Sequence, residues 1–582
     1  MARDTQDCVQ DSGANSETID NCEWEKGEHL MPFKYVFVPE DARKFTKEDG
    51  WFRDASRRYV LFRGVNFGSR SKMPPYLPVY PLEARNFSKQ TLMEELQEVS
   101  GQLAQLKHLG FNVVRLVVQW KALAPTPSTI ASEKYLDAVK TIVQTLFELG
   151  IYSLIDFHQD IASERYGGDG FPDWAIAYPP APPANVKPFA GWQARYGWPS
   201  WPPMLASKVK NTLRSFWKDE TKNGDSIFHT QSMFVDSIRA TVKAFKKLPG
   251  VLGYEPFNEP DPVGIKGPVF EQAYLGPFYK NVIHQVGDVD KGAFVFIEPR
   301  VDWTVFKRPA QIQTYLPQDF PGSRTVFSFH YYDSCTAFLA DVFKRSANMS
   351  GKPELWSRIF EKTLDAAKQR HLIPFLTEYG CDYDGAHAWQ APAKANSHDY
   401  PRQSRAYTDL SLQQIEKNLL NSTMWAFDLY ATLLHSDNWN NEDSSLLDWK
   451  GQIRDPDIVS RPYPVRSSAR PVLLFFDSFS KHGATILKGT PVTNAPSVVY
   501  VPDEIQYPNG FEVHHTSGHI DWDSANHLLY WSPNMTHGEH QLIVCPENGL
   551  DKRVLPQESQ DLLLRTRMVF TPRAHGVLRR RR

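Results

Sequence analysis

Cysteine is scarce in this chain, and its few cysteines form no recognisable site. Five occur in 582 residues: Cys8, Cys22, Cys335, Cys381 and Cys545. The odd count and wide spacing argue against a disulfide framework. No group of His, Cys or Asp has the close spacing of a metal site, so we expect no bound metal.

Long apolar runs and an excess of one charge are absent too. No run of about 18 apolar residues occurs, which predicts that no segment spans a membrane. The start, Met1–Asp7, is polar and lacks the apolar core of a signal peptide, so we expect a cytoplasmic location. The net charge of −2 does not indicate a nucleic-acid partner. Four arginines, Arg579–Arg582, could contact an anionic membrane surface, although such basic ends are more often simply solvated.

Apolar strand-like runs alternate with amphipathic helical stretches from about residue 58. This order predicts an α/β fold, a (β/α)8 TIM barrel, with long loops. A doubly wound sheet is the alternative, but Gly64–Gly68 is not the phosphate-binding turn that such a sheet carries. The predicted strands are Tyr59–Asn66, Asn112–Gln119, Tyr152–Phe157, Val251–Pro256, Ala293–Glu298, Thr325–His330, Pro374–Glu378 and Thr423–Phe427. The predicted helices include Leu92–Leu109, Glu133–Leu149, Val235–Lys247, Trp356–Gln369 and Gln403–Leu420.

The pattern changes after residue 465 to short strands with turn signals, which predicts a C-terminal antiparallel β-sandwich. We therefore expect a polar N-terminal extension (1–57), the catalytic barrel (58–464), the sandwich (465–550) and a basic C-terminal tail (551–582). The Pro- and Trp-rich stretch Tyr178–Met204 follows the third strand. It is equally compatible with an apolar wall beside the site and with a structural insertion.

Two glutamates end predicted strands more than a hundred residues apart. Glu259 closes Gly253–Pro260, and Glu378 lies in Phe375–Gly380. Parallel barrels present their chemistry at the carboxyl ends of strands. A pair of carboxyls about 5 Å apart is what a retaining glycosidase uses, one as acid and the other as nucleophile.

Other polar residues fall at the same strand ends. Arg115 and His330 are expected to orient the nucleophile, and a buried Arg requires a carboxylate partner. Asn258 is placed to donate to a sugar hydroxyl, and Glu255 is interpreted as structural. Glu298 is a third candidate carboxyl that spacing alone does not exclude. Further candidates to contact substrate are Asp156 and His158, which share one face of a strand, with Tyr332 and Trp425.

This set resembles glycoside hydrolase family 5 of clan A, in its endoglycoceramidase-related branch. The branch is suggested by the strings Arg63–Asn66, Ser71–Pro75, Asp156–Asp160, Gly168–Trp174, Asn438–Asp443 and Arg461–Pro464. The resemblance implies that Glu259 is the acid/base and Glu378 the nucleophile. It also implies that Lys72, Asp156, Asn258 and Trp425 contact the sugar. The segment Ala426–Tyr430 departs from the branch pattern.

The resemblance implies a retaining β-glycosidase, without a cofactor, that hydrolyses the β-glucosidic bond of glycolipids such as glucosylceramide or steryl glucoside. Another β-glucoside, with a different apolar aglycone, remains open as the substrate. Two alternatives also remain open: an endo-acting glycoceramidase that releases oligosaccharide from ceramide, and a non-catalytic glycolipid-binding protein.

Overall fold

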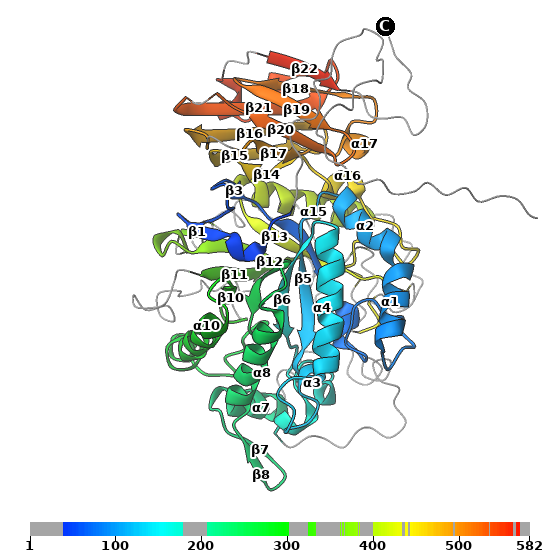
Figure 1. Ribbon diagram of the computed structural model, residues 1–582, viewed down its shortest axis with the longest axis vertical. Helices are drawn as coiled ribbons and strands as arrows, with labels where there is room; N and C mark the ends of the chain where they lie inside the picture. Colours follow the sequence, from blue (N-terminus) through cyan, green and yellow to red (C-terminus); the bar gives the residue numbers. More distant parts are fainter. Residues whose placement is uncertain are drawn as a thin grey trace, which may run out of the picture.

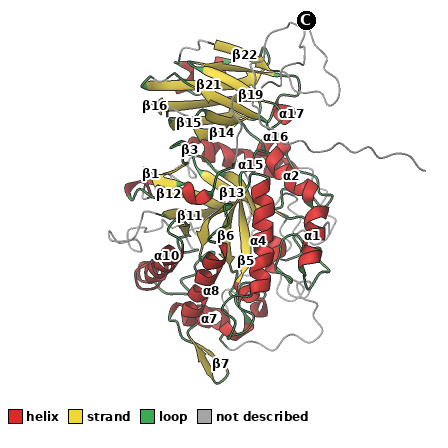
Figure 2. Cartoon of the chain, in the orientation of Figure 1, coloured by secondary structure: helices red, strands yellow, loops and turns green. Residues whose placement is uncertain are grey.

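The protein has a helix-wrapped barrel and, above it in Figure 1, a domain built almost entirely of strands (Figure 2). The computed structural model describes residues 39–177, 207–301, 324–332, 361, 364–365, 367–381, 383, 400–432, 437–439, 443–492, 495–534, 536–562 and 566–570. The Pro- and Trp-rich stretch, most of the helix expected over Trp356–Gln369, and the terminal arginines lie outside these residues.

Eight parallel strands close into a barrel in the order β10-β11-β12-β13-β4-β5-β6-β9. The fold class predicted from the alternating pattern is therefore confirmed. The strands are β4 (Arg63–Phe67), β5 (Val113–Gln119), β6 (Tyr152–His158), β9 (Val251–Glu255), β10 (Phe294–Ile297), β11 (Thr325–Tyr331), β12 (Ile373–Tyr379) and β13 (Asn421–Phe427).

Helices cover the outside of the barrel. In α4, Leu136, Val139 and Val143 lie on one buried stripe, and full burial of each such side chain contributes about 1.5–3 kcal/mol. The helix expected over Leu92–Leu109 is two helices, because the weak helix formers Ser100 and Gly101 follow the break at Val99. The helices are α1 (Lys89–Glu98), α2 (Ser100–His108), α3 (Trp120–Leu123), α4 (Glu133–Glu148), α7 (Ser207–Trp217), α8 (Thr230–Phe245), α9 (Gly267–Phe270), α10 (Gly276–Val289) and α15 (Tyr400–Lys417). Between them, η2 (Ser69–Lys72) is a short 3-10 turn and β7 (Thr221–Asn223) pairs with β8 (Ser226–Phe228).

The two ends of the barrel interior differ in polarity. At the amino ends of the strands, an apolar cluster fills the interior, and Ala42, Phe45 and Phe52 close it at that end. On β5, Val113 belongs to this cluster and Val117 packs against Trp425 at the other end. Side chains alternate along a strand, so the residue between them, Arg115, occupies a middle layer of the interior.

Two antiparallel sheets pack face to face in the second domain, as the sequence predicted. One sheet has the order β1-β2-β3-β14-β17-β20-β19 and the other β15-β16-β21-β18-β22. Side chains of both sheets form one apolar cluster, which includes Leu487, Val513, Leu529 and Trp531. The strands are β1 (Thr46–Glu48), β2 (Trp51–Arg53), β3 (Tyr59–Val60), β14 (Tyr463–Ser467), β15 (Arg470–Asp477), β16 (His482–Gly489), β17 (Ser497–Tyr500), β18 (Phe511–His515), β19 (His519–Asp523), β20 (Leu528–Ser532), β21 (Gly538–Pro546) and β22 (Thr566–Phe570). The short helices are α16 (Pro456–Val459), α17 (Asp503–Gln506) and α18 (Gln557–Gln560).

These sheets reach beyond the stretch 465–550 at both ends. Strands β1–β3, from residues 46–60, extend one sheet through β14, and β22, from residues 566–570, extends the other. The domain boundaries drawn from the sequence remain a proposal, and they do not follow these strand pairings.

The sandwich packs on the amino ends of the barrel strands. Tyr463 and Tyr500 donate hydrogen bonds to the carbonyl oxygens of Gly110 and His108, just before β5. The carboxyl ends of the strands, with α3 and the β7–β8 hairpin, lie at the opposite end of the molecule (Figure 1). Among the described residues, no helix combines the length and apolar composition needed to cross a membrane.

Gly64 provides a test of the barrel packing. A Cβ at this position would lie 1.6 Å from the carbonyl oxygen of Val113 on the neighbouring strand. Because backbone atoms cannot move aside easily, Gly64→Ala is expected to lower the free energy of unfolding by roughly 3 kcal/mol. Gly101→Ala is the control, since a Cβ there meets nothing within 4 Å and Ala favours helix by up to about 1 kcal/mol. Equal stabilities of the two variants in denaturant unfolding would contradict this packing.

Candidate active site

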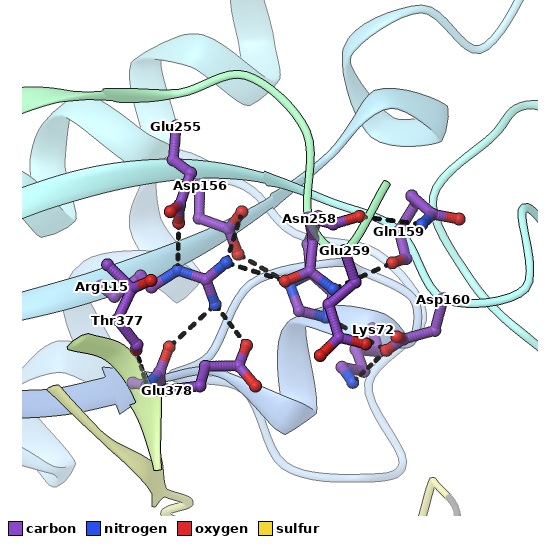
Figure 3. Close-up of polar contacts among 12 residues, drawn as sticks. Lys72, Arg115, Asp156, Gln159, Asp160, Glu255, Asn258, Glu259, Thr377 and Glu378 are labelled. Carbon is purple, nitrogen blue, oxygen red and sulfur yellow. Dashed lines mark hydrogen bonds and ion pairs between the residues drawn. The ribbon is translucent and has the colours of Figure 1, made fainter. Parts of the chain in front are cut away.

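Arg115 lies at the centre of the polar end of the barrel and is fully buried (Figure 3). Its Nη1 donates to Glu378 Oε1 at 2.5 Å, and its Nη2 lies 3.1 Å from Asp156 Oδ1. Its Nε donates to Glu255, and Nη2 also lies 3.5 Å from Glu298 Oε1. One guanidinium therefore faces four carboxyls, three from strands and one just after β10, which is possible because its five N–H groups spread in a plane.

A β-bulge aims Glu378 into the barrel. On β11 and β12, Phe329 pairs with Leu376 but His330 pairs with Glu378, so Thr377 is an extra residue. A bulge of this kind redirects the side chain that follows it. The carbonyl oxygen of Thr377 accepts hydrogen bonds from Asn66 Nδ2 at 2.9 Å and Thr423 Oγ1 at 2.6 Å, which hold the bulge in place.

Glu259 lies in the turn after β9, facing Glu378. Its φ of +45° is in the left-handed region, which few residues other than glycine adopt. The adjacent Asn258 accepts from Arg115 Nη2 at 2.8 Å and donates to the Gln159 carbonyl at 3.1 Å, so the start of the turn is tied to two strands. Carboxylate oxygens of Glu259 and Glu378 and a nitrogen of His330 all lie within 4.8 Å of one another.

The two glutamates have different surroundings. Burial alone would raise the pKa of Glu378, but the charges of His330 and Arg115 lower it overall. Tyr332 adds a hydrogen bond from its hydroxyl to Glu378 Oε2 at 2.8 Å. His330 Nδ1 lies 2.9 Å from Glu259 Oε1 and 3.5 Å from Glu378 Oε2. Burial opposes a charge on His330, yet the neighbouring carboxylates raise its pKa well above the usual range.

The remaining predicted residues line the other side of the site. His158 Nδ1 bonds Asp156 at 2.6 Å, and the imidazole stacks on Trp425 with ring centroids 5.7 Å apart. Burial would lower the pKa of His158, but Asp156 raises it to about 10. The Lys72 ammonium lies 4.5 Å from the centre of the Trp425 ring. Asp156, predicted to contact the sugar, is fully buried between Arg115 and His158, 3.1 Å from Arg115 Nη2 and 2.6 Å from His158 Nδ1.

Two residues of this region had no role in the sequence analysis. Asp160 Oδ2 accepts from Lys72 at 2.6 Å, and 22% of its side chain is exposed in the site. Burial would raise the pKa of Asp160, but Lys72 and His158 hold it below the usual range. Trp439 covers the other side of Lys72, with its ring centre 3.9 Å from Nζ. Alternation along the chain places position 160 on the face of 156 and 158, a signal that could have indicated Asp160.

Some of these groups have the donor set of a metal site. Among the described residues, His158, Asp160 and Asp169 bring ligand atoms within 4.8 Å of one another, as do Glu259, His330 and Glu378. Lys72 already contacts Asp160, and Arg115 contacts Glu378. With Glu259 near Glu378, the site offers two carboxyls of different character across a short gap.

Comparison with protein families shows where this site belongs. The family model described as cellulase (glycosyl hydrolase family 5) matches residues 81–430, more than half of the chain. The chain belongs to glycoside hydrolase family 5. The match includes Arg115, Glu259, His330 and Glu378, whereas Lys72 and Trp439 lie outside it.

Several named proteins resemble this family 5 chain. It is 29% identical to an endoglycoceramidase of Cyanea nozakii over 302 residues, 48% of this chain and 55% of that protein. It is 26% identical to a glucosylceramidase of Rhizopus delemar over 242 residues, 36% of this chain and 35% of that protein. The chain therefore spans about half or less of the length of these relatives. An endoglycoceramidase I of Rhodococcus hoagii is 25% identical over 80% of this chain and 81% of its own length.

Solved structures share the fold. Sterylglucosidase 1 of Cryptococcus neoformans superposes with a TM-score of 0.68 at 16% identity, over 87% of this chain and 98% of that one. Endo-glycoceramidase II from Rhodococcus sp. superposes with a TM-score of 0.61 at 20% identity, over 85% and 99%. The barrel with its appended strands is therefore a shared architecture.

Arg115→Met tests the buried ion network. It leaves several buried carboxylates without their cation, which is expected to cost about 3–5 kcal/mol of unfolding free energy. The loss of unfolding free energy relative to the wild type should become smaller as the pH falls, because protonation neutralises the unpaired carboxylates. Arg57→Met is the control: Arg57 pairs with Glu48 at 3.0 Å with 70% of its side chain exposed, so about 0–1 kcal/mol is expected. Equal losses in denaturant unfolding would show that the network does not stabilise the barrel.

Proposed function

We propose that the protein is a retaining β-glycosidase in which Glu378 is the nucleophile and Glu259 the acid/base. The observation that carries the proposal is the approach of the two carboxyls, with oxygens within 4.8 Å of each other at the carboxyl ends of β12 and β9. Retaining enzymes hold these groups about 5–5.5 Å apart, whereas inverting enzymes need about 6.5–9.5 Å to admit a water molecule.

In the first step, a Glu378 oxygen forms a bond to the anomeric carbon. The bond from that carbon to the leaving oxygen breaks, its electron pair stays on the oxygen, and Glu259 gives this oxygen a proton. Arg115, Tyr332 and the charged His330 favour an ionised Glu378, as a nucleophile requires. Glu259 is the more exposed of the two, with 23% of its side chain accessible against 7% for Glu378. It is therefore the group better placed to reach a leaving oxygen.

In the second step, Glu259, now a carboxylate, takes a proton from water. The water oxygen bonds to the anomeric carbon, and the bond to Glu378 breaks with its electron pair returning to the carboxylate. The products are the free sugar and the alcohol, and both carboxyls regain their starting states. Every proton comes from Glu259 and water, so the scheme uses no cofactor.

The sugar-contacting role is proposed for the residues around Trp425. The Trp425 ring provides an apolar face for a sugar ring, and Lys72, Asp160 and His158 provide polar groups beside it. The Asn258 amide accepts a hydrogen bond from Arg115 and donates one to the Gln159 carbonyl. We therefore propose that Asn258 supports the Glu259 turn as well as contacting the sugar.

We propose a glycolipid with a single β-linked glucose as the substrate. Relatives and structural neighbours are named glucosylceramidase, ergosteryl-beta-glucosidase and sterylglucosidase, which supports this class. Other relatives are named endoglycoceramidase, which favours release of a whole oligosaccharide as the second candidate. Contact with a membrane surface belongs to the same proposal because the substrate is a lipid. A cytoplasmic location remains an expectation from the N-terminal sequence.

Replacement of either glutamate tests the chemistry. Glu259→Gln and Glu378→Gln are each expected to lower kcat by at least about 10²-fold, because one removes the acid and the other the covalent route. Glu148→Gln, on the exposed side of α4, is the control and should match the wild type. Rates close to wild type in either active-site variant would disprove the assignment. An inert wild type that binds glycolipid would favour the binding-protein alternative.

A substrate panel decides between the two candidates. We would offer glucosylceramide, a steryl glucoside and lactosylceramide to the purified protein and identify the released sugar. Free glucose from the first two and no product from the third is expected for a glucosidase. Intact lactose from the third would show the endo-acting alternative and contradict the single-glucose proposal.

A further inference from the structure

Glu298, immediately after β10, is a third carboxyl beside the two proposed catalytic glutamates. Only 3% of its side chain is exposed, less than for Glu259 or Glu378. A sugar ring therefore cannot reach it without displacing its neighbours. Tyr279 on α10 fixes its backbone, since the tyrosine hydroxyl accepts from the Glu298 N–H at 3.1 Å and donates to the Glu298 carbonyl at 3.0 Å.

One oxygen of Glu298 holds the turn that carries Glu259. Glu298 Oε2 accepts the backbone N–H of Glu259 at 3.1 Å. The turn adopts the left-handed φ of Glu259, which needs support from surrounding contacts. A second link joins the same two segments, where the N–H of Val301 donates to the Pro260 carbonyl at 2.9 Å. The segment after β10 thus sets the position of the proposed acid.

The other oxygen faces the histidine that joins both catalytic carboxyls. Glu298 Oε1 lies 3.3 Å from His330 Nε2, while His330 Nδ1 faces Glu259 and Glu378. A carboxylate beside one imidazole nitrogen fixes how the ring is turned and stabilises its charged form.

The charges that face Glu298 come from three strands. Burial raises its pKa to about 8, the charge of Glu255 on β9 acts in the same direction, and His330 on β11 and Arg115 on β5 oppose them. Among the carboxylates that raise the pKa of His330 against the effect of burial, Glu298 has the largest effect. The protonation of Glu298 and that of His330 therefore depend on each other.

We propose that Glu298 is a positioning residue for the proposed acid/base: it anchors the Glu259 backbone through one oxygen and orients His330 toward Glu259 through the other. This inference rests on the proposed function. It has a specific consequence for kcat/KM, which reports the first step: a displaced acid lowers kcat/KM only where the leaving oxygen needs a proton. Its loss as the base of the second step would lower kcat for every substrate. An alkyl or lipid alkoxide needs that proton, whereas dinitrophenolate leaves without it.

Kinetics of Glu298→Ala on two substrates test the proposal. On an alkyl β-glucoside, kcat/KM should fall about 10²-fold, the cost of misplacing a catalytic group by about 1 Å. On dinitrophenyl β-glucoside the loss in kcat/KM should stay within a few-fold. Glu298→Gln keeps an oxygen for the Glu259 N–H and should restore most of the alkyl glucoside rate. Equal losses on both substrates, or no loss on either, would overturn the proposal. A Gln variant that is inert on both would make Glu298 the nucleophile.

A control and a second readout separate this proposal from the proposed function. Glu271→Gln removes a buried carboxyl that pairs with Arg300 at 2.9 Å, and it should lower stability without changing the ratio of the two rates. The His330 imidazole can also be titrated by NMR, with its signal assigned through a His330→Gln variant. Its pKa should fall in Glu298→Gln, because a carboxylate that stabilises the imidazolium is gone. An unchanged pKa contradicts the proposal even if the wild type hydrolyses neither substrate.

Discussion

The attraction between the buried Arg115 guanidinium and the carboxyls around it determines the rest of the site. Three carboxyls contact it from three strands: Asp156, Glu255 and Glu378. Asn258 links it to the turn that carries Glu259. Without the guanidinium these carboxyls would repel one another in a layer that excludes water. The same cation therefore stabilises the polar end of the barrel and favours the ionised form of the proposed nucleophile.

Carboxyls outnumber cationic groups across the site. Four cationic groups, Arg115, His158, His330 and Lys72, lie among seven carboxyls, Asp156, Asp160, Asp169, Glu255, Glu259, Glu298 and Glu378. Burial raises the pKa of Asp169 to about 7 and that of Glu298 to about 8, which reduces the excess of negative charge.

The sequence predicts the features that depend on local patterns. All eight barrel strands are recognisable because each is a short apolar run, and the polar residues at their ends converge because the strands are parallel. The bulge at Thr377 is not predictable, because it depends on the register between β11 and β12. Residues 46–53 appear polar in sequence, and only pairing with each other and with β3 makes them strands. The anchoring role of Glu298 requires a backbone N–H from another strand end, which no spacing reveals.

The chemistry proposed for this site is a double displacement by two carboxyls at close range. The configuration of the sugar at the moment of release tests it, followed by proton NMR in the first minutes of hydrolysis of a β-glucoside. We expect the β-anomer to appear first and then to equilibrate with the α-anomer, because each of two displacements inverts the anomeric carbon. An α-anomer as the first product would mean a single displacement by water and would contradict the roles assigned to Glu259 and Glu378.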